Sequence, residues 1–403
     1  MAAAEPLQST SDTFVLSFDN KAEADAIAAA KAMRPLLQKK TQIHHQIGEM
    51  TPEVVSAVTE AKFHGLAVPK RWGGGNLSSA ALARVSAEVA RGCPSTAWSV
   101  SITNSVSWMA SQMKDSMQEA VFAKGIPMMT SPQNGAGTLS EVDGGYLLSG
   151  RWAYGSNCHH AEYALLQGIF NGETPIMTLV NIADVTRLDT WDVVGMRGSG
   201  SDTLVADNVF VPYSNTTKMA GVSSGEPFSY EKESSDYWVA FPLLRAKAVG
   251  VLVGTVEGQL DAVVAGSTKP VLYTNYVQKQ DSAAYRSVIG EAATKIRTAR
   301  SIMDSTNNMV DAAALEARVF TNEESHYIRA EVALAIKLLS EASNTLMDLS
   351  GSSGFSESSP AQRYWLDFNV GSRHVIFNSY ISFETYGDFV LGRDLSVMDE
   401  LFV

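Results

Sequence analysis

The chain has 403 residues, of which 45% are hydrophobic and 18% charged, a composition typical of a folded globular protein and not of a disordered one. A formal net charge of −12 argues against a broad basic surface for nucleic acid or anionic lipid. Cys93 and Cys158 form no CxxC pair, so we expect reduced thiols and neither a disulfide framework nor a zinc site. The N-terminus lacks the basic start of a signal peptide, and no uninterrupted apolar run reaches membrane-spanning length, which favours a cytoplasmic protein without a membrane segment.

The first region, residues 1–127, has the pattern of helices. Leu82, Val85 and Val89 recur at i, i+3 and i+7, which predicts one apolar helix face. A serine at 78–79 is suited to cap the start of this helix.

The second region, about 128–235, has the pattern of strands and turns. An Asp-Gly-Gly sequence at 143–145 separates two apolar and β-branched stretches, 138–142 and 146–152, and predicts a hairpin. A β-branched run at 176–182 predicts a further strand.

The third region, about 236–403, returns to helices. Apolar residues step by four and three from Ile328 to Leu349 and stop at Gly351, which suits an antiparallel bundle or a contact with another subunit. Helices, then strands, then helices is not the alternation of a doubly wound sheet, and no GxGxxG follows a predicted strand. The chain therefore divides into an N-terminal helical domain (1–127), a central β domain (128–235) and a C-terminal helical domain (236–403).

Four segments, in this order and spacing, resemble the acyl-CoA dehydrogenase superfamily across most of the chain. They are the early turn at 65–75 (GLAVPKRWGGG), the flavin-side segment at 130–132 (TSP), the strand at 150–157 (GRWAYGSN) and the strand pair at 195–212. The resemblance implies an α+β fold: an N-terminal helical domain, a central β-barrel-like domain and a C-terminal four-helix bundle.

Finer details resemble one branch, the two-component flavin monooxygenases. Trp191 precedes the GMRGSGS sequence, residues 92–98 read GCPSTAW, and residues 362–367 (QRYWLD) are followed by His374. This branch implies an oxygenase component that uses reduced flavin and O₂, through a flavin C4a-hydroperoxide, to hydroxylate a small aromatic or phenolic substrate. It also implies a separate NAD(P)H-dependent flavin reductase and a homotetramer.

The sequence departs from the true dehydrogenases at three places. The late Glu base is missing: the corresponding position falls near His374, and Glu384 lies outside the expected motif. The Arg-containing FAD segment is absent around 274–282, and the glycine-rich loop has become DLSGSSG at 348–354. Both losses weaken the hold on the adenine half of FAD, so reduced FMN is the expected cofactor and FAD the alternative.

Two residues are the candidate catalytic groups. Ser156, on the strand that passes the flavin in the resembled family, is expected to bond the flavin N5 atom. His374 is the candidate base, because an imidazole with a pKa of about 6.5 suits proton transfer near neutrality. Arg363, Asp367 and His374 are spaced i, i+4 and i+11 and would share one face if the helix beginning near Pro360 continues; the alternative is that Gly371 ends this helix before His374.

The remaining candidates follow from position in the resembled motifs. Those expected at the flavin, with Ser156, are Thr130, Ser131, Trp152 and Asn157, and those considered for its phosphate are Ser352, Ser353 and Lys279. Those expected at the substrate are Trp98, Asn104 and His159. No metal site is expected, because adjacent histidines on a strand, such as His159 and His160, point to opposite faces.

Three other functions remain open. The first is an FAD-dependent acyl-CoA dehydrogenase or oxidase, against which the missing Glu argues. The second is N-oxygenation of an amine, since pocket shape and not motif decides the substrate. The third is a non-catalytic flavin-binding scaffold on the same fold.

Overall fold

The structure is a computed structural model that describes residues 16–219, 221, 225 and 227–394. Its first part is helical, as predicted, and the side chain of Ser78 caps the third helix by accepting the N–H of Ala81. These helices are α1 (Asn20–Ile47), α2 (Pro52–Glu60), α3 (Ser79–Ala90), α4 (Pro94–Ser111) and α5 (Asp115–Phe122).

The middle part forms one mixed sheet of eight strands in the order β6-β7-β3-β2-β4-β5-β8, with β1 beside β4. The predicted hairpin is confirmed: β2 pairs antiparallel with β3 around Gly144, whose φ is +80°. The strands are β1 (Met129–Thr130), β2 (Gly137–Val142), β3 (Gly145–Gly155), β4 (Tyr163–Phe170), β5 (Thr174–Asn181), β6 (Thr186–Leu188), β7 (Asp202–Pro212) and β8 (Thr216–Lys218).

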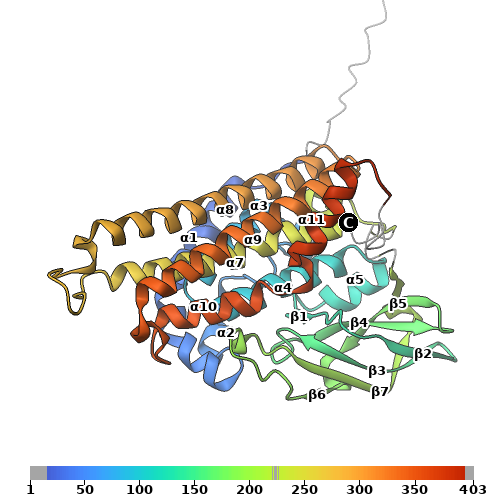
Figure 1. Cartoon of the computed structure of the whole chain (residues 1–403). Coiled ribbons are helices and arrows are strands. Elements are labelled where there is room, and N and C mark those ends of the chain that lie inside the picture. The colour runs from blue at the N-terminus through green and yellow to red at the C-terminus, as the bar shows by residue number, and fades with distance from the viewer. Residues whose placement is uncertain (1–15, 220, 222–224, 226, 395–403) are drawn as a thin grey trace, which may run out of the picture.

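The last part is a bundle in which long helices lie side by side above the sheet (Figure 1). The predicted stripe from Ile328 to Leu349 lies on α9 and is buried in the bundle as far as Leu346, while Leu349 is half-buried. Its helices are α7 (Ala240–Ala265), α8 (Ala283–Leu315), α9 (Asn322–Ser350), α10 (Pro360–Gly371) and α11 (Ser379–Val390). Eight short 3₁₀ helices complete the described chain: η1 (Lys70–Trp72), η2 (Ile182–Asp184), η3 (Arg197–Ser199), η4 (Tyr213–Asn215), η5 (Ser234–Tyr237), η6 (Lys279–Asp281), η7 (Ser352–Phe355) and η8 (Val375–Phe377).

Helix α7 is the central helix of the molecule. Among the described helices it alone is long and apolar enough to cross a membrane, but most of its apolar window is buried inside the fold. Its approach to α3 needs glycine: a Cβ on Gly250 or Gly254 would lie 2.2 or 2.1 Å from a backbone oxygen of α3. The apolar character of α7 therefore serves core packing.

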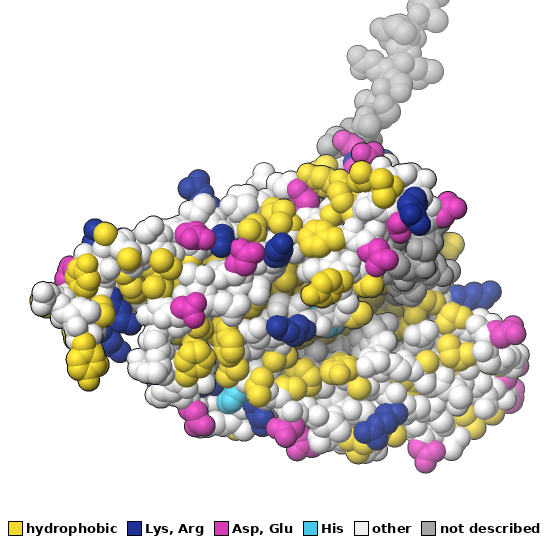
Figure 2. All heavy atoms as spheres, viewed as in Figure 1, with side chains coloured by type: hydrophobic (Ala, Val, Ile, Leu, Met, Phe, Trp, Pro, Cys, Tyr) yellow, Lys and Arg dark blue, Asp and Glu magenta, His cyan; other side chains and the backbone are white. Residues whose placement is uncertain are grey.

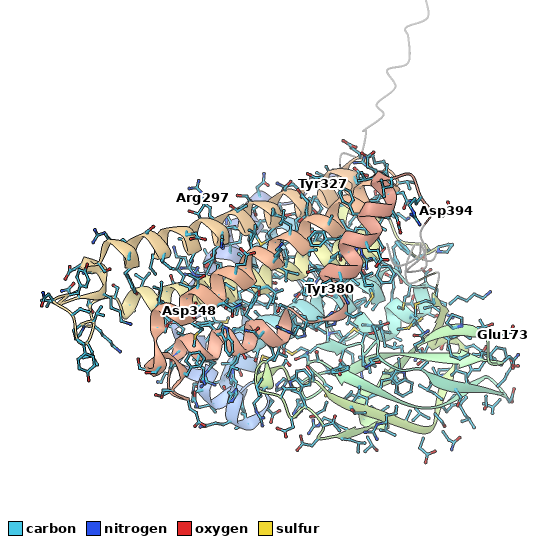
Figure 3. The ribbon with its side chains drawn as sticks, viewed as in Figure 1. Glu173, Arg297, Tyr327, Asp348, Tyr380 and Asp394 are labelled. Atoms are coloured by element: carbon cyan, nitrogen blue, oxygen red, sulfur yellow. The ribbon has the colours of Figure 1, made fainter. Side chains whose placement is uncertain are left out.

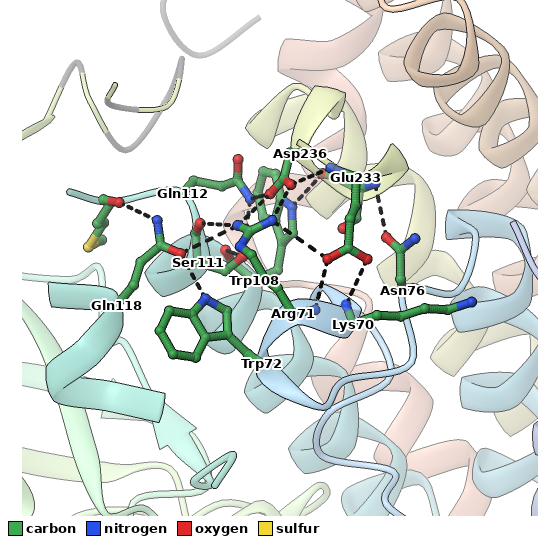
Figure 4. Close-up of polar contacts among 12 residues, drawn as sticks. Lys70, Arg71, Trp72, Asn76, Trp108, Ser111, Gln112, Gln118, Glu233 and Asp236 are labelled. Carbon is green, nitrogen blue, oxygen red and sulfur yellow. Dashed lines mark hydrogen bonds and ion pairs between the residues drawn. The ribbon is translucent and has the colours of Figure 1, made fainter. Parts of the chain in front are cut away.

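A polar network fixes the segment that leads into α7 (Figure 4). The Glu233 carboxylate accepts the backbone N–H groups of Lys70 and Arg71 at 2.8 and 2.9 Å. The Arg71 guanidinium reaches Asp236 and the carbonyl of Ser111 at the end of α4. These bonds hold the start of α7 against α4 and η1.

The sheet contributes to two separate cores. Leu165, Met177 and Leu179 belong to the large core shared with the helices. Leu148 and Trp152 belong to a smaller core within the β domain. A strand side chain therefore faces either the helices or the interior of the β domain.

Candidate active site

The end of β3 turns sharply at Ser156. The pairing of β3 with β7 shifts register between Trp152 and Gly155, and Tyr154 and Asn157 adopt left-handed φ values of +63° and +68°. Such irregularities re-aim the side chains that follow them and are concentrated at functional sites. Here the change of direction brings Ser156 to α4.

Ser156 is held by groups from three elements. The indole Nε1 of Trp98, on α4, donates to Ser156 Oγ at 3.1 Å. Thr130 Oγ1 donates to the carbonyl of Ser156 at 2.7 Å, and the hydroxyl of Ser201 lies 2.8 Å from Ser156 Oγ. Thr130 and Ser156 are thus brought together.

The turn before β7 rests on α10. Asp367 Oδ1, on α10, accepts the N–H of Met196 at 2.5 Å. Gly195 allows this approach, since a Cβ there would lie 2.3 Å from the carbonyl oxygen of Leu366. Burial raises the pKa of Asp367 to about 6. Asp367 therefore positions the turn that carries Ser201.

His374 follows α10 and is not part of it. Of the two possibilities that the sequence left open, the second holds: α10 ends at Gly371, so Arg363, Asp367 and His374 do not share one continuous helix. Arg363 instead donates to the carbonyl of Glu357, while Asp367 accepts the N–H of Met196. Gly371 and the turn after it set His374 at the start of η8.

The ring of His374 packs against Trp98, with 5.4 Å between ring centroids. His374 Nδ1 accepts the N–H of Ile376 at 3.3 Å, so the neutral ring carries its proton on Nε2. Burial lowers the pKa of His374 to about 4. At neutral pH this histidine is an uncharged donor through Nε2.

Asn157 tests whether the residues near Ser156 suit a flavin. Its side chain is 1% exposed, and within the described chain neither Oδ1 nor Nδ2 has a hydrogen-bond partner. A buried amide without partners is costly, on the order of 1–3 kcal/mol. The polar edge of a flavin ring offers both carbonyl acceptors and an N–H donor, which an amide can pair. The residues therefore fit the group.

Ser131, which the resemblance places at the flavin, adjoins Thr130 and is half-buried, and it donates to the carbonyl of Leu165 at 2.9 Å. On the face shown in Figure 2, the molecule is hollowed between the C-terminal helices and the sheet. Ser156 comes from the sheet side and His374 from the helical side, and Trp98 contacts both.

The structure does not bring Trp152 or Asn104 to this group. Trp152 is fully buried in the β-domain core and donates to the carbonyl of Gln167 at 2.9 Å, because it precedes the register shift. The side-chain amide of Asn104 is hydrogen-bonded to the backbone. Its Oδ1 accepts the N–H of Ala67 at 3.0 Å, and its Nδ2 donates to the carbonyl oxygens of Phe63 and Val100.

His159 lies on the other side of the turn. Its Nδ1 is 3.0 Å from Glu49 Oε2, and its Nε2 is 2.7 Å from Asp202 Oδ2. Both nitrogens are therefore committed. An adjacent cavity of about 260 Å³ is lined by His159, by two arginines, Arg187 and Arg197, and by two aspartates, Asp189 and Asp202.

The three residues considered for the flavin phosphate lie elsewhere. Ser352 and Ser353 begin η7 after α9, and Lys279 donates to the carbonyl of Leu349 at 3.0 Å. Figure 3 labels Asp348, on this end of α9, at the outer end of the bundle, away from Tyr380. Within the described chain, no hydrogen bond connects these three residues to Ser156.

Sequence reasoning missed Ser199 and Ser201. In the sequence they belong to the GMRGSGS motif, and neither is among the candidate site residues. Ser201 Oγ lies 2.8 Å from Ser156 Oγ and 2.7 Å from Ser199 Oγ. Small hydroxyl residues in a glycine-rich turn were the available signal, but only the folded chain shows which strand they meet.

Comparison with known proteins gives consistent results. The acyl-CoA dehydrogenase N-terminal domain matches residues 23–130, and the acyl-CoA dehydrogenase C-terminal domain matches residues 247–379. The chain is 29% identical to a pigment production hydroxylase of Rhodococcus sp. (strain ATCC 21145), over 92% of this chain and 96% of that one. It is 26% identical to the p-hydroxyphenylacetate 3-hydroxylase oxygenase component of Acinetobacter baumannii, over 91% and 87%.

A solved structure is also similar. XiaF from Streptomyces sp., in complex with FADH2 and glycerol, superposes with a TM-score of 0.89 at 26% identity, over 94% of this chain and 98% of that one.

Proposed function

This chain belongs to the acyl-CoA dehydrogenase superfamily, and from that premise we propose that it is the oxygenase component of a two-component flavin-dependent monooxygenase that hydroxylates a small aromatic substrate. One observation carries the proposal: a single indole, Trp98, donates to Ser156 on the sheet side and packs on His374 on the helical side. The cofactor-side candidate Ser156 and the substrate-side candidate His374 are therefore linked through one side chain.

Reduced flavin, FMN or FAD, supplies the activation of O₂ when bound. The chain itself supplies binding and orientation. Asn157 would pair its free amide with the polar edge of the ring and Ser156 would hydrogen-bond its N5 atom, while Thr130 fixes the backbone of Ser156. Ser131 borders the same segment.

His374 acts on the substrate. With Nδ1 occupied by the N–H of Ile376 and a pKa of about 4, it presents Nε2–H to the substrate oxygen. This differs from the expected role as a base: the neutral Nε2–H can only donate, so His374 would stabilise a substrate that binds already as the phenolate and would not take up its proton. A phenolate is the better nucleophile toward an electrophilic oxygen atom, so the donor promotes ring hydroxylation.

Trp98 closes the space between the two sides. Its side chain is buried and belongs to the large core. A wall of this kind limits access of water, which protects a reactive cofactor state and strengthens the hydrogen bonds within the site.

The dehydrogenase alternative is disfavoured by the site. It requires a carboxylate base facing the flavin, and the position is occupied by His374, while Glu384 is exposed on α11. N-oxygenation of an amine would use the same residues with a different substrate.

The proposal includes a separate NAD(P)H-dependent flavin reductase, a cytoplasmic location and a homotetramer. Support for assembly comes from exposed apolar side chains between α7 and α8, namely Leu272, Tyr273 and Val277. Light scattering on the purified chain tests the tetramer, and a mass of one chain contradicts it.

The deciding experiment mixes the purified chain and chemically reduced FMN with a simple phenol in ¹⁸O₂. We expect one ¹⁸O atom in the product and none without protein. The contrary result is reduction of bound oxidised flavin by an acyl-CoA with no labelled phenol product, which would establish the dehydrogenase function.

A further inference from the structure

A chain of hydroxyl groups runs away from Ser156 into the protein. Ser156 Oγ lies 2.8 Å from Ser201 Oγ, Ser201 Oγ lies 2.7 Å from Ser199 Oγ, and Ser199 Oγ donates to the carbonyl of Met196 at 2.7 Å. The three serines are 8%, 4% and 2% exposed, so solvent does not compete for these bonds. We refer to Ser156, Ser201 and Ser199 as the serine relay.

The carbonyl at the acceptor end of the serine relay fixes the direction of every hydrogen bond in it. At one end the Trp98 indole can only donate to Ser156, and at the other the Met196 carbonyl can only accept from Ser199. Ser199 therefore accepts from Ser201, and Ser201 accepts from Ser156. The opposite direction would set two acceptors against each other at 2.7 Å between Ser199 and Met196.

The acceptor end is itself held in place. Met196 has a left-handed φ of +56°, and its N–H is bound by Asp367 on α10. Its carbonyl also accepts the indole N–H of Trp191 at 3.0 Å. The polarity of the relay thus depends on a rigid turn and not on a mobile side chain.

In this arrangement Ser156 donates its hydrogen bond to Ser201 and accepts one from Trp98. It keeps one lone pair and no donor for a ligand. The N5 atom of reduced flavin carries a hydrogen and donates, whereas N5 of oxidised flavin only accepts. A hydroxyl with a free lone pair matches the reduced form and opposes the oxidised form.

We propose that the serine relay selects reduced over oxidised flavin, with Ser201 and Ser199 as positioning residues that hold Ser156 as an acceptor. The inference rests on the proposed function, because it requires that the flavin N5 faces Ser156. It adds a reason why an oxygenase fed from a mixed flavin pool takes up the form that reacts with O₂.

The test measures the dissociation constants of oxidised FMN and of dithionite-reduced FMN by anaerobic equilibrium dialysis. The variants are Ser201→Ala, which frees the Ser156 proton, and Ser201→Thr, which retains the hydroxyl. Ser105→Ala is the matched control, since Ser105 is a buried α4 serine that bonds the carbonyl of Ser101 outside the relay.

We expect wild type to prefer reduced FMN. Ser201→Ala should lower the ratio of the oxidised to the reduced dissociation constant by about 2- to 10-fold, the worth of one hydrogen bond, because Ser156 can then rotate and donate to oxidised N5. Ser201→Thr and Ser105→Ala should keep the wild-type ratio. If Ser201→Ala does not fold, Ser199→Ala carries the same test, since it removes the acceptor that orients Ser201.

Two results overturn the inference and differ from each other. A folded Ser201→Ala protein that weakens both forms equally, or leaves the ratio unchanged, shows that the serines are only structural and leaves the proposed function standing. A folded wild-type protein that binds neither form of FMN nor of FAD overturns the relay and the proposed function together.

Discussion

Two histidines on opposite sides of one turn show how differently the same side chain is used. His159 has a carboxylate on each ring nitrogen, from Glu49 and from Asp202. His374 has one nitrogen on a backbone N–H, and its Nε2 has no partner within the described chain. A ring whose two nitrogens are both hydrogen-bonded, as in His159, ties the segment at Glu49 to Asp202 of the sheet. A ring with one nitrogen free of a partner can form a hydrogen bond with a substrate.

Two asparagines repeat the contrast. Asn104 bonds three backbone groups and pins the segment 63–67 to α4. Asn157 is equally buried and bonds none through its side chain in the described structure. The open hydrogen-bonding capacity, and not the residue type or burial, separates the candidate site from the scaffold.

The largest expected effect is on His374. His374→Ala removes the donor to the substrate oxygen, and we expect the rate of phenol hydroxylation to fall by about 10- to 100-fold, the range for a hydrogen bond to a charged group. Binding of reduced FMN should change little. His374→Asn, which keeps an N–H donor, should recover part of the rate in single-turnover product analysis. An unchanged rate in His374→Ala would remove His374 from the site.

The opposite behaviour is expected of His159. His159→Ala leaves the buried carboxylate of Asp202 without one partner, and we expect the free energy of unfolding to fall by about 1–3 kcal/mol. Urea denaturation measures this loss, and dialysis should show unchanged FMN affinity. Loss of FMN binding without loss of stability would place His159 in the functional group after all.

The asparagines give a paired test. Asn157→Ala should weaken FMN binding by up to about 10-fold and leave stability unchanged or raised, because it removes an unpaired buried amide. Asn104→Ala should lower stability by about 1–3 kcal/mol, because it leaves buried backbone groups unpaired. Calorimetric melting with and without FMN separates the two, and identical profiles for both variants would contradict the contrast.

The smallest effect concerns pH. Burial lowers the pKa of His44 to about 4, below its unfolded value of about 6.5. Between these values the unfolded chain binds the extra proton, so the contribution of His44 to stability is full above pH 6.5 and is lost as pH falls towards 4. Asp311 and Asp367, with pKa values raised to about 6, act in the opposite sense over part of this range.

The comparison is therefore between His44→Gln and wild type. The variant should show a shallower decline of Tm between pH 6.5 and 4, because glutamine binds no proton in either the folded or the unfolded state. Parallel Tm profiles would mean that His44 titrates alike in both states.

The sequence by itself determined the local elements and the family. The turn at 143–145, the cap at Ser78 and the stripe on α9 follow from turn chemistry and periodicity, which involve residues close in the chain. Motifs pointed to Ser156, Asn157 and His374 for the same reason: each lies within a short, ordered segment. The resemblance also gave the fold, because its four segments span both the helical and the strand regions.

Only the tertiary structure decided which polar side chains keep a hydrogen-bonding atom without a partner in the described chain. A register shift against β7 sends Trp152 into the β-domain core and Ser156 towards α4. Residues distant in sequence occupy the hydrogen-bonding atoms of His159 and Asn104. The hydroxyl that meets Ser156 comes from Ser201, 45 residues further along the chain. Hydrogen-bond satisfaction is a sum over neighbours in space, so no pattern along the chain can reveal it.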